Sequence, residues 1–188
     1  MNSKLLLLLP GLPLLLSLQS LHAADVDEAQ LKQEAIGIVK QFADSLKPEL
    51  KKALETGGPV YAISVCSEKA PSIAQNLSKD SGWMVKRVSL KARGATAVPD
   101  AWEKKVLEEF DQRQADGESA ATMAYTEVVD GSFRFMKAQG VEAVCLNCHA
   151  AEIDPKVEAA IKQKYPNDMA RGYTLGQIRG AFSLSRDL

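Results

Sequence analysis

Histidine and cysteine are scarce in this sequence, which contains two histidines and three cysteines in 188 residues. One histidine, His22, lies in the amino-terminal stretch, so His149 is the only histidine in the rest of the chain. This scarcity excludes any site in the main body of the chain that requires two imidazoles. Because the number of cysteines is odd, intramolecular disulfides would leave at least one thiol unpaired.

The chain also lacks a strong excess of charge, a second copy of any motif and an internal repeat. The formal net charge is −1 at pH 7. A balance of this kind argues against nucleic acid or an anionic membrane surface as the partner. The pattern of apolar residues shows no alternation of strand and helix that would indicate a parallel sheet.

The amino terminus has the three parts of an export signal. A short positive stretch, Met1–Lys4, precedes the apolar run Leu5–Leu18, and Leu21–Ala23 approximates a cleavage site. The apolar run is interrupted by proline and glycine, and it is too short for a comfortable membrane span. We predict a signal peptide over residues 1–23 and one domain over 24–188, exported to the periplasm or beyond and soluble after cleavage. An uncleaved anchor is the alternative interpretation.

One pentapeptide carries a specific chemical pattern, Cys145-Leu146-Asn147-Cys148-His149. C-x-x-C-H is the attachment sequence for a c-type haem. Two intervening residues let one helical turn span the two porphyrin vinyl groups, to which the thiols add. The histidine after the second thioether is then the proximal iron ligand. The motif occurs once, so the sequence predicts one covalently attached haem c.

Two other interpretations of the pentapeptide remain open. A C-x-x-C pair can form a disulfide or a thioredoxin-like redox site, although such sites normally open a helix after a parallel strand. A zinc ion is a further candidate, held by a Cys₃His set made of Cys66, Cys145, Cys148 and His149. That set requires the adjacent Cys148 and His149 to reach one tetrahedral metal, which is unfavourable.

Once His22 leaves with the predicted signal peptide, His149 is the only histidine, so a haem iron in the mature chain cannot have two imidazole ligands. The sixth position is empty or filled by methionine, cysteine, lysine, tyrosine or an amine. Cys66, the cysteine outside the motif, is therefore a candidate ligand, although a lone cysteine is most often a small buried apolar residue. A plain electron carrier with a methionine ligand is the alternative, and its candidates are Met84, Met123, Met136 and Met169.

Arginines provide a further candidate contact. Arg87 and Arg93 belong to a basic set that overlaps and follows a strand-like segment. A guanidinium binds a carboxylate through two parallel hydrogen bonds, so these residues are candidates to pair with haem propionates. The competing interpretation is a solvated sheet edge.

The periodicity of apolar residues predicts a mixture of helices and antiparallel strands, and hence an α+β fold. We expect Pro48 to kink the first helix, and Pro71 to interrupt the chain and restart a short helix. The Asp130-Gly131 pair predicts a tight hairpin turn. The expected helices are 25–54, one opened by Pro59, 72–78, one opened by Pro99-Asp100, a short one within 141–149, and 155–164. The expected strands are 83–90, 121–129, 132–138 and 177–185.

Four segments in this order make the chain resemble the PAS-like single-haem c-type cytochrome family. The resemblance extends over most of residues 31–184. Members occur alone or as the extracellular sensor part of histidine kinases. The segments are Ala62–Ser67 with Ala70-Pro71, Arg87–Lys91 with Arg93, Pro99–Glu103, and Cys145–His149.

The resemblance implies a PAS-like antiparallel sheet with flanking helices, and a haem iron held by the motif histidine, here His149, and by a cysteine, here Cys66. It also implies a haem protein used in redox or small-ligand sensing or in electron transfer. We therefore expect a redox or signalling protein as partner and a diatomic gas as a candidate ligand. A distal thiolate would block a substrate, and no further histidine remains as an acid or base, so we do not expect an enzyme.

Overall fold

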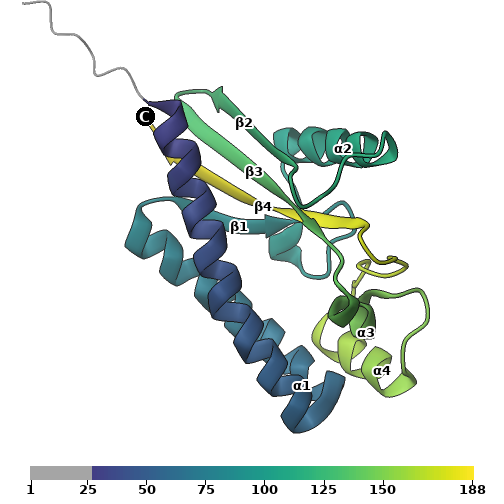
Figure 1. Cartoon of the computed structure of the whole chain (residues 1–188). Coiled ribbons are helices and arrows are strands. Elements are labelled where there is room, and N and C mark those ends of the chain that lie inside the picture. Colours follow the sequence, from purple (N-terminus) through teal and green to yellow (C-terminus); the bar gives the residue numbers. More distant parts are fainter. Residues whose placement is uncertain (1–26) are drawn as a thin grey trace, which may run out of the picture.

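The computed structural model describes residues 27–188 and shows an α+β domain with flanking helices on both faces of one sheet (Figure 1). The signal peptide predicted over residues 1–23 lies outside the described residues. Within the described part, no helix is both long and apolar enough to cross a membrane. The elements are α1 (Glu28–Ser81), β1 (Met84–Val88), η1 (Ala95–Ala97), α2 (Ala101–Ala115), β2 (Ala124–Val129), β3 (Ser132–Gly140), η2 (Ala143–Cys145), α3 (Leu146–His149), α4 (Pro155–Lys164) and β4 (Ile178–Asp187).

The four strands form one antiparallel sheet in the order β1-β4-β3-β2. The predicted hairpin between β2 and β3 is confirmed. Its turn residues Asp130 and Gly131 have φ values of 50° and 76°, which is the left-handed pair that a tight hairpin turn needs. The last strand of the chain, β4, lies in the interior of the sheet between β1 and β3, so the carboxyl-terminal segment is central to the fold.

The first helix is two helical segments separated by a sharp turn, and Figure 1 shows the second segment returning alongside the first. Asp27 caps its start by accepting a hydrogen bond from the Gln30 amide. Gly58 breaks the helix with φ 69°, where the sequence predicts the end of the first helix. Pro59 begins the second segment, a position where its missing N–H costs no hydrogen bond.

The interruption expected at Pro71 is wrong, and Pro48 does not interrupt the helix either, because both prolines lie inside helical backbone and Gly58 is the one non-helical residue in α1. The kink expected at Pro48 stays a prediction. A proline inside a helix costs about 3 kcal/mol. The residues around Pro71 recover this cost by packing. Ala70 is buried, and Ile73, Ala74 and Leu77 pack against the same core cluster. The stretch 72–78 is therefore the last part of a longer helix rather than a separate one.

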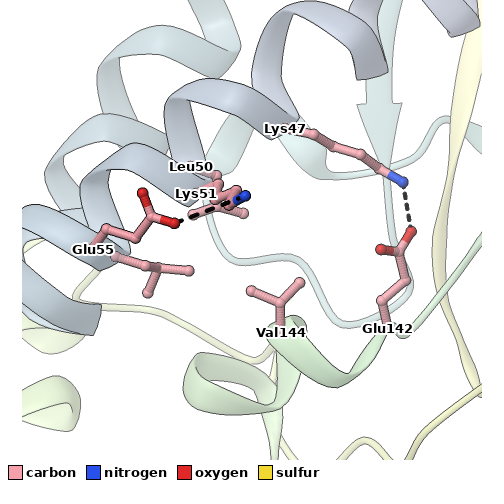
Figure 2. Close-up of a pocket in the computed structure, with 7 residues that line it drawn as sticks. Lys47, Leu50, Lys51, Glu55, Glu142 and Val144 are labelled. Carbon is pink, nitrogen blue, oxygen red and sulfur yellow. Dashed lines mark hydrogen bonds and ion pairs between the residues drawn. The ribbon is translucent and has the colours of Figure 1, made fainter.

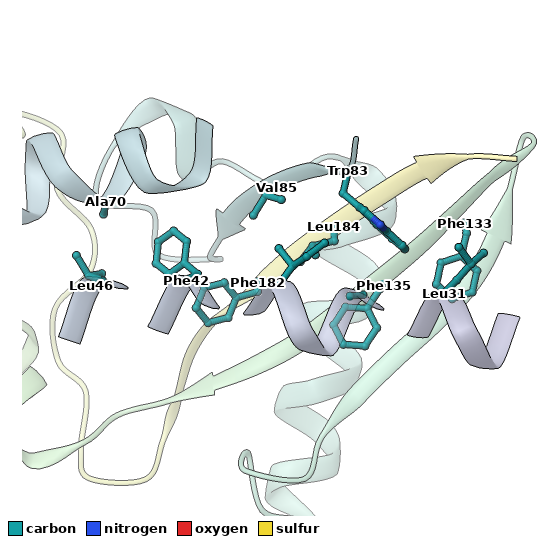
Figure 3. Close-up of a cluster of buried hydrophobic side chains, with 12 residues drawn as sticks. Leu31, Phe42, Leu46, Ala70, Trp83, Val85, Phe133, Phe135, Phe182 and Leu184 are labelled. Carbon is teal, nitrogen blue, oxygen red and sulfur yellow. The ribbon is translucent and has the colours of Figure 1, made fainter. Parts of the chain in front are cut away.

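The main core lies between α1 and the sheet (Figure 3). The predicted apolar stripe of the first helix is confirmed, since its members are buried against aromatic residues of β3 and β4. Phe42 meets Phe182 edge-on with ring centroids 5.1 Å apart, and Trp83 meets Phe133 at 6.0 Å. The stripe consists of Leu31, Ala35, Ile38, Phe42 and Leu46.

The opposite face of the sheet is covered by α2. This helix begins where the sequence predicts, because Asp100 and Glu103 form a complete capping box. Val106, Leu107 and Phe110 are buried beneath it against a second cluster of apolar residues. The sheet therefore has a buried layer on each side, and the short helices α3 and α4 lie at one end of it (Figure 1).

Candidate functional site

The pentapeptide Cys145–His149 forms a compact helical turn at the end of the sheet, made by η2 and α3. Its two cysteines pack against different surroundings. Cys145 lies with Val141, Ala170 and Tyr173, whereas Cys148 lies against the cluster centred on Ile63 and α4. All three cysteines of the chain are free thiols in this structure. The turn therefore presents two thiols and one imidazole over a few residues.

The imidazole of His149 is held in one orientation. Its Nδ1 lies 2.8 Å from the carbonyl oxygen of Ala170, and because a carbonyl only accepts, Nδ1 carries the proton and donates it. Nε2 is then the ring nitrogen with a free lone pair, as in histidines that ligate a metal. Burial, together with the positive charges of Arg179 and Arg93, lowers the pKa of His149 to about 3. The ring is therefore neutral at any ordinary pH.

Cys66 comes from the second segment of α1 and lies near the pentapeptide. Ile63, one helical turn earlier, packs with Cys148 in the same apolar cluster. Burial raises the pKa of the Cys66 thiol, and the nearby charges of Arg87, Arg179 and Arg93 partly oppose this. Cys145 and Cys66 are also close enough for their charges to interact. The fold thus brings together the sulfur atoms of residues 66, 145 and 148.

Arg93 ties the pentapeptide to the neighbouring loop. Its guanidinium forms an ion pair with Asp168, with Nε 3.0 Å from the carboxylate, and it donates to the carbonyl oxygens of Cys148 at 2.7 Å and Ala170 at 3.3 Å. The Ala170 carbonyl also accepts the hydrogen bond from His149 Nδ1. Arg93 therefore holds both the acceptor of that bond and the backbone next to His149. A direct role of Arg93 toward a propionate stays a prediction.

Arg87 and Arg179 are partly buried, and among residues 27–188 no acidic side chain forms an ion pair with either of them. Burial and repulsion from Arg179 lower the pKa of Arg87 to about 10, and burial lowers the pKa of Arg179. Arg87 lies over the Phe42 ring, 5.1 Å from its centroid. The Nε of Arg179 is buried without a hydrogen-bond partner. Both charges lie near Cys66.

Arg179 was not predicted as a site residue. Its only sequence signal is that it is a charged residue at the start of an otherwise apolar strand. The structure explains its position through Gly180, which has φ 149°, and at which a side-chain carbon would collide with the carbonyl oxygen of Val88. This close approach of β4 to β1 holds the Arg179 backbone, whose carbonyl accepts from the Ser89 hydroxyl at 2.7 Å.

A groove of about 460 Å³ opens beside the pentapeptide, between the first segment of α1 and the residues that precede Cys145 (Figure 2). Its floor is apolar, made by Leu50, Leu54 and Val144. An ion pair closes one side, with Lys47 Nζ 2.7 Å from the Glu142 carboxylate. The groove is therefore an apolar space next to the first cysteine of the motif.

The alternatives drawn from the sequence find little support in the geometry. Within residues 27–188, no group of three or more histidine, cysteine or acidic side chains is arranged to hold a metal ion. Met123 and Met136 are fully buried under α2, on the far face of the sheet. Met84 and Met169 are exposed, and Met169 adjoins Ala170, on the Nδ1 side of the imidazole ring.

These features define a class: an α+β domain built on a four-stranded antiparallel sheet, with a C-x-x-C-H turn at one end and a third cysteine brought to it by a long amino-terminal helix. The family model of the Tll0287-like proteins matches residues 19–186. The chain therefore belongs to the Tll0287-like family, which confirms the family resemblance seen in the sequence.

A solved structure has the same fold. The crystal structure of the cyanobacterial heme-protein Tll0287 matches with a TM-score of 0.68 and 22% sequence identity, covering 84% of this chain and 95% of that one. At this identity the likeness establishes the fold, and it confirms the predicted α+β class with an antiparallel sheet and flanking helices. No curated protein sequence matches the chain.

Proposed function

We propose that this chain is an exported c-type haem protein that carries one covalently attached haem. In this proposal Cys145 and Cys148 form the thioether bonds, and His149 and Cys66 are the axial ligands of the iron. The protein would serve redox or small-ligand sensing, or electron transfer, and would pass its signal or electron to a protein partner.

The observation that carries the proposal is the orientation of His149 within the C-x-x-C-H turn. A buried neutral imidazole donates through Nδ1 to Ala170 and leaves Nε2 free, which is the arrangement of a histidine that ligates a metal. The two thiols of the same turn would form the thioether bonds, and an apolar groove lined by Val144 lies next to the first of them. Membership in the Tll0287-like family, and the fold shared with the cyanobacterial heme-protein Tll0287, also support the proposal.

The residues of the chain have separate roles in this proposal. Arg93 holds the pentapeptide and the Ala170 loop together, which fixes the imidazole ring. Burial raises the pKa of the Cys66 thiol, and the charges of the neighbouring arginines partly oppose this rise, so a bound iron would supply the rest of the stabilisation of a thiolate. When bound, a haem would supply one-electron redox chemistry, and it would offer a site for a diatomic gas when Cys66 is protonated or released from the iron. An anionic sulfur ligand favours the ferric state, so Cys66 would lower the reduction potential.

Attachment is tested by intact mass. The chain expressed with a cytochrome c maturation system should carry the mass of one haem through denaturation, and the double variant Cys145→Ala/Cys148→Ala should not. A wild-type chain that leaves this system without haem, or with bound zinc, would overturn the proposal.

The sixth ligand is tested by electron paramagnetic resonance and absorption spectroscopy of the ferric protein. Wild type should be low-spin with a sulfur ligand, and Cys66→Ala should change to a high-spin or differently ligated species. Ser64→Ala, on the same helical segment, is the matched control and should keep the wild-type spectrum. A Cys66→Ala spectrum identical to wild type would show that Cys66 is not an iron ligand. An absorption band of methionine ligation would instead favour the plain electron carrier.

A further inference from the structure

We propose that Arg87 and Arg179 form a paired anion site that holds the two haem propionates, with Arg93 reserved for fixing the attachment motif. The inference rests on the proposed haem function and identifies which residues of the chain bind the acidic groups of the cofactor.

The first argument is the burial of two like charges without a counter-charge. Arg87 on β1 and Arg179 on β4 are partly buried, and the Arg179 Nε is fully enclosed. Burial lowers the pKa of both guanidinium groups, and the charge of Arg179 further lowers that of Arg87. No acidic side chain within residues 27–188 forms an ion pair with either of them. A buried charge without a partner costs several kcal/mol, so such positions are maintained when a ligand supplies the opposite charge.

The second argument is the unused hydrogen-bonding capacity. Arg179 Nε is buried with no acceptor. A guanidinium presents its N–H groups as a planar fork that matches a carboxylate. Arg87 has only the face of the Phe42 ring beneath it, which leaves the edge of its guanidinium for an acceptor. The acceptor that fits two such forks is a pair of carboxylates.

The third argument is position. Both arginines act on the pKa of Cys66, and Arg179 also acts on that of His149, so the pair lies beside the proposed iron ligands. An iron(III) porphyrin core carries one net positive charge, which a thiolate from Cys66 would cancel. The two guanidinium charges then remain to balance the two propionates.

Arg93 differs from this pair in its surroundings. Asp168 already neutralises its charge, at 3.0 Å from Nε, and the carbonyl oxygens of Cys148 and Ala170 take further N–H groups. Its guanidinium is already paired with groups of the chain and does not require a further anion. Arg93 is therefore a positioning residue for the motif.

The test uses the haem-loaded protein, after intact mass has shown that wild type carries haem. Resonance Raman spectroscopy reads the propionate bending vibrations, and spectroelectrochemistry reads the reduction potential. We expect Arg179→Gln and Arg87→Gln each to shift the propionate bands and to lower the potential, because a positive charge near the haem is lost. Arg186→Gln is the matched control, since Arg186 lies at the other end of β4 and pairs with Glu34.

Arg87→Lys and Arg179→Lys serve where a glutamine variant does not accumulate. They keep the charge but lose the fork, so we expect shifted propionate bands with a smaller change in potential. Propionate bands that match wild type in the variants of both positions would overturn the inference, whether or not the potential falls. A wild-type protein without haem would instead overturn the proposed function itself.

Discussion

Two sets of charged residues on neighbouring parts of the sheet, around Glu103 and around Arg87 and Arg179, differ in whether the chain neutralises their charge. Under α2, the carboxylate of Glu103 is completely buried, yet it is surrounded by partners from three strands. It lies 2.9 Å from Lys86 Nζ on β1, accepts from the Ser183 hydroxyl on β4 at 2.6 Å, and lies 3.5 Å from Arg134 on β3. Its second oxygen accepts from the Asp100 amide at 2.8 Å.

Beside the C-x-x-C-H turn the situation is reversed. Arg87 and Arg179 are partly buried, less deeply than Glu103, and within residues 27–188 no acidic side chain forms an ion pair with either of them. The comparison shows that burial alone does not identify a functional charge. A buried charge that the chain itself neutralises fastens elements of the fold together, whereas buried charges that the chain leaves unbalanced indicate a ligand of opposite sign.

The largest expected effect is at Glu103. Glu103→Ala leaves Lys86 and Arg134 without their buried partner and should lower the free energy of unfolding by about 3 kcal/mol or more. Denaturant unfolding measures this loss. The control is Glu108→Ala on the same helix, whose exposed pair with Lys104 should contribute about 0.5 kcal/mol or less. A loss for Glu103→Ala as small as that of the control would contradict the comparison.

When no haem is attached, replacing Arg179 should leave the free energy of unfolding unchanged or raise it, the opposite of the loss expected at Glu103. In a Cys145→Ser/Cys148→Ser background, Arg179→Met replaces an unbalanced, partly buried charge with an apolar side chain, so the free energy of unfolding should stay level or rise, by up to about 1–2 kcal/mol. In the haem-loaded protein the same substitution should lower it, because a ligand carboxylate loses its partner. Thermal unfolding of the four proteins gives the coupling. Equal losses with and without haem would mean that Arg179 is structural.

The smallest expected change in the free energy of unfolding is at Asp100, and this change depends on pH. Burial raises its pKa, but the hydrogen bond from the Glu103 amide and the contact with Arg134 outweigh this and hold the pKa below its usual range. A carboxyl with a lowered pKa stabilises the fold above its ordinary pKa of about 4, and that stability is lost as the pH falls through the folded value.

Asp100→Ala removes the helix cap and should cost about 1 kcal/mol at pH 7. The difference from wild type should shrink as the pH falls below about 4, where the wild-type carboxyl becomes protonated. Urea unfolding at a series of pH values measures it. A difference that is the same at pH 7 and pH 3 would show that the charge of Asp100 does not act in the native state.

Much of the fold was predictable because its signals are local. The Asp130-Gly131 turn, the Asp100–Glu103 capping box and the apolar stripe of the first helix each depend on residues a few positions apart. The expectation for Pro71 was wrong because the packing of Ala70 and its neighbours against the sheet overrides a local preference, and that packing depends on strands far along the chain.

The residues of the candidate site also fall into two groups, those that a local sequence pattern identifies and those that only the tertiary structure brings together. Cys145, Cys148 and His149 lie within five residues of the sequence, so their pattern alone predicts the proposed attachment chemistry. By contrast, the balance of charge around them depends on which residues are brought together from distant segments. Arg93 meets Asp168 only because two loops converge, and Arg179 becomes a site residue only because β4 passes close to β1 at Gly180.

The sequence by itself determined the C-x-x-C-H motif, the scarcity of histidine and the mixed α+β class, because each is a matter of residue identity or short-range periodicity. Only the tertiary structure decided which nitrogen of His149 is free, that Cys66 lies near the motif, and which arginines lack a counter-charge. The physical reason is that hydrogen-bond partners and electrostatic balance are set by distances through space, and these follow from how the strands and helices pack.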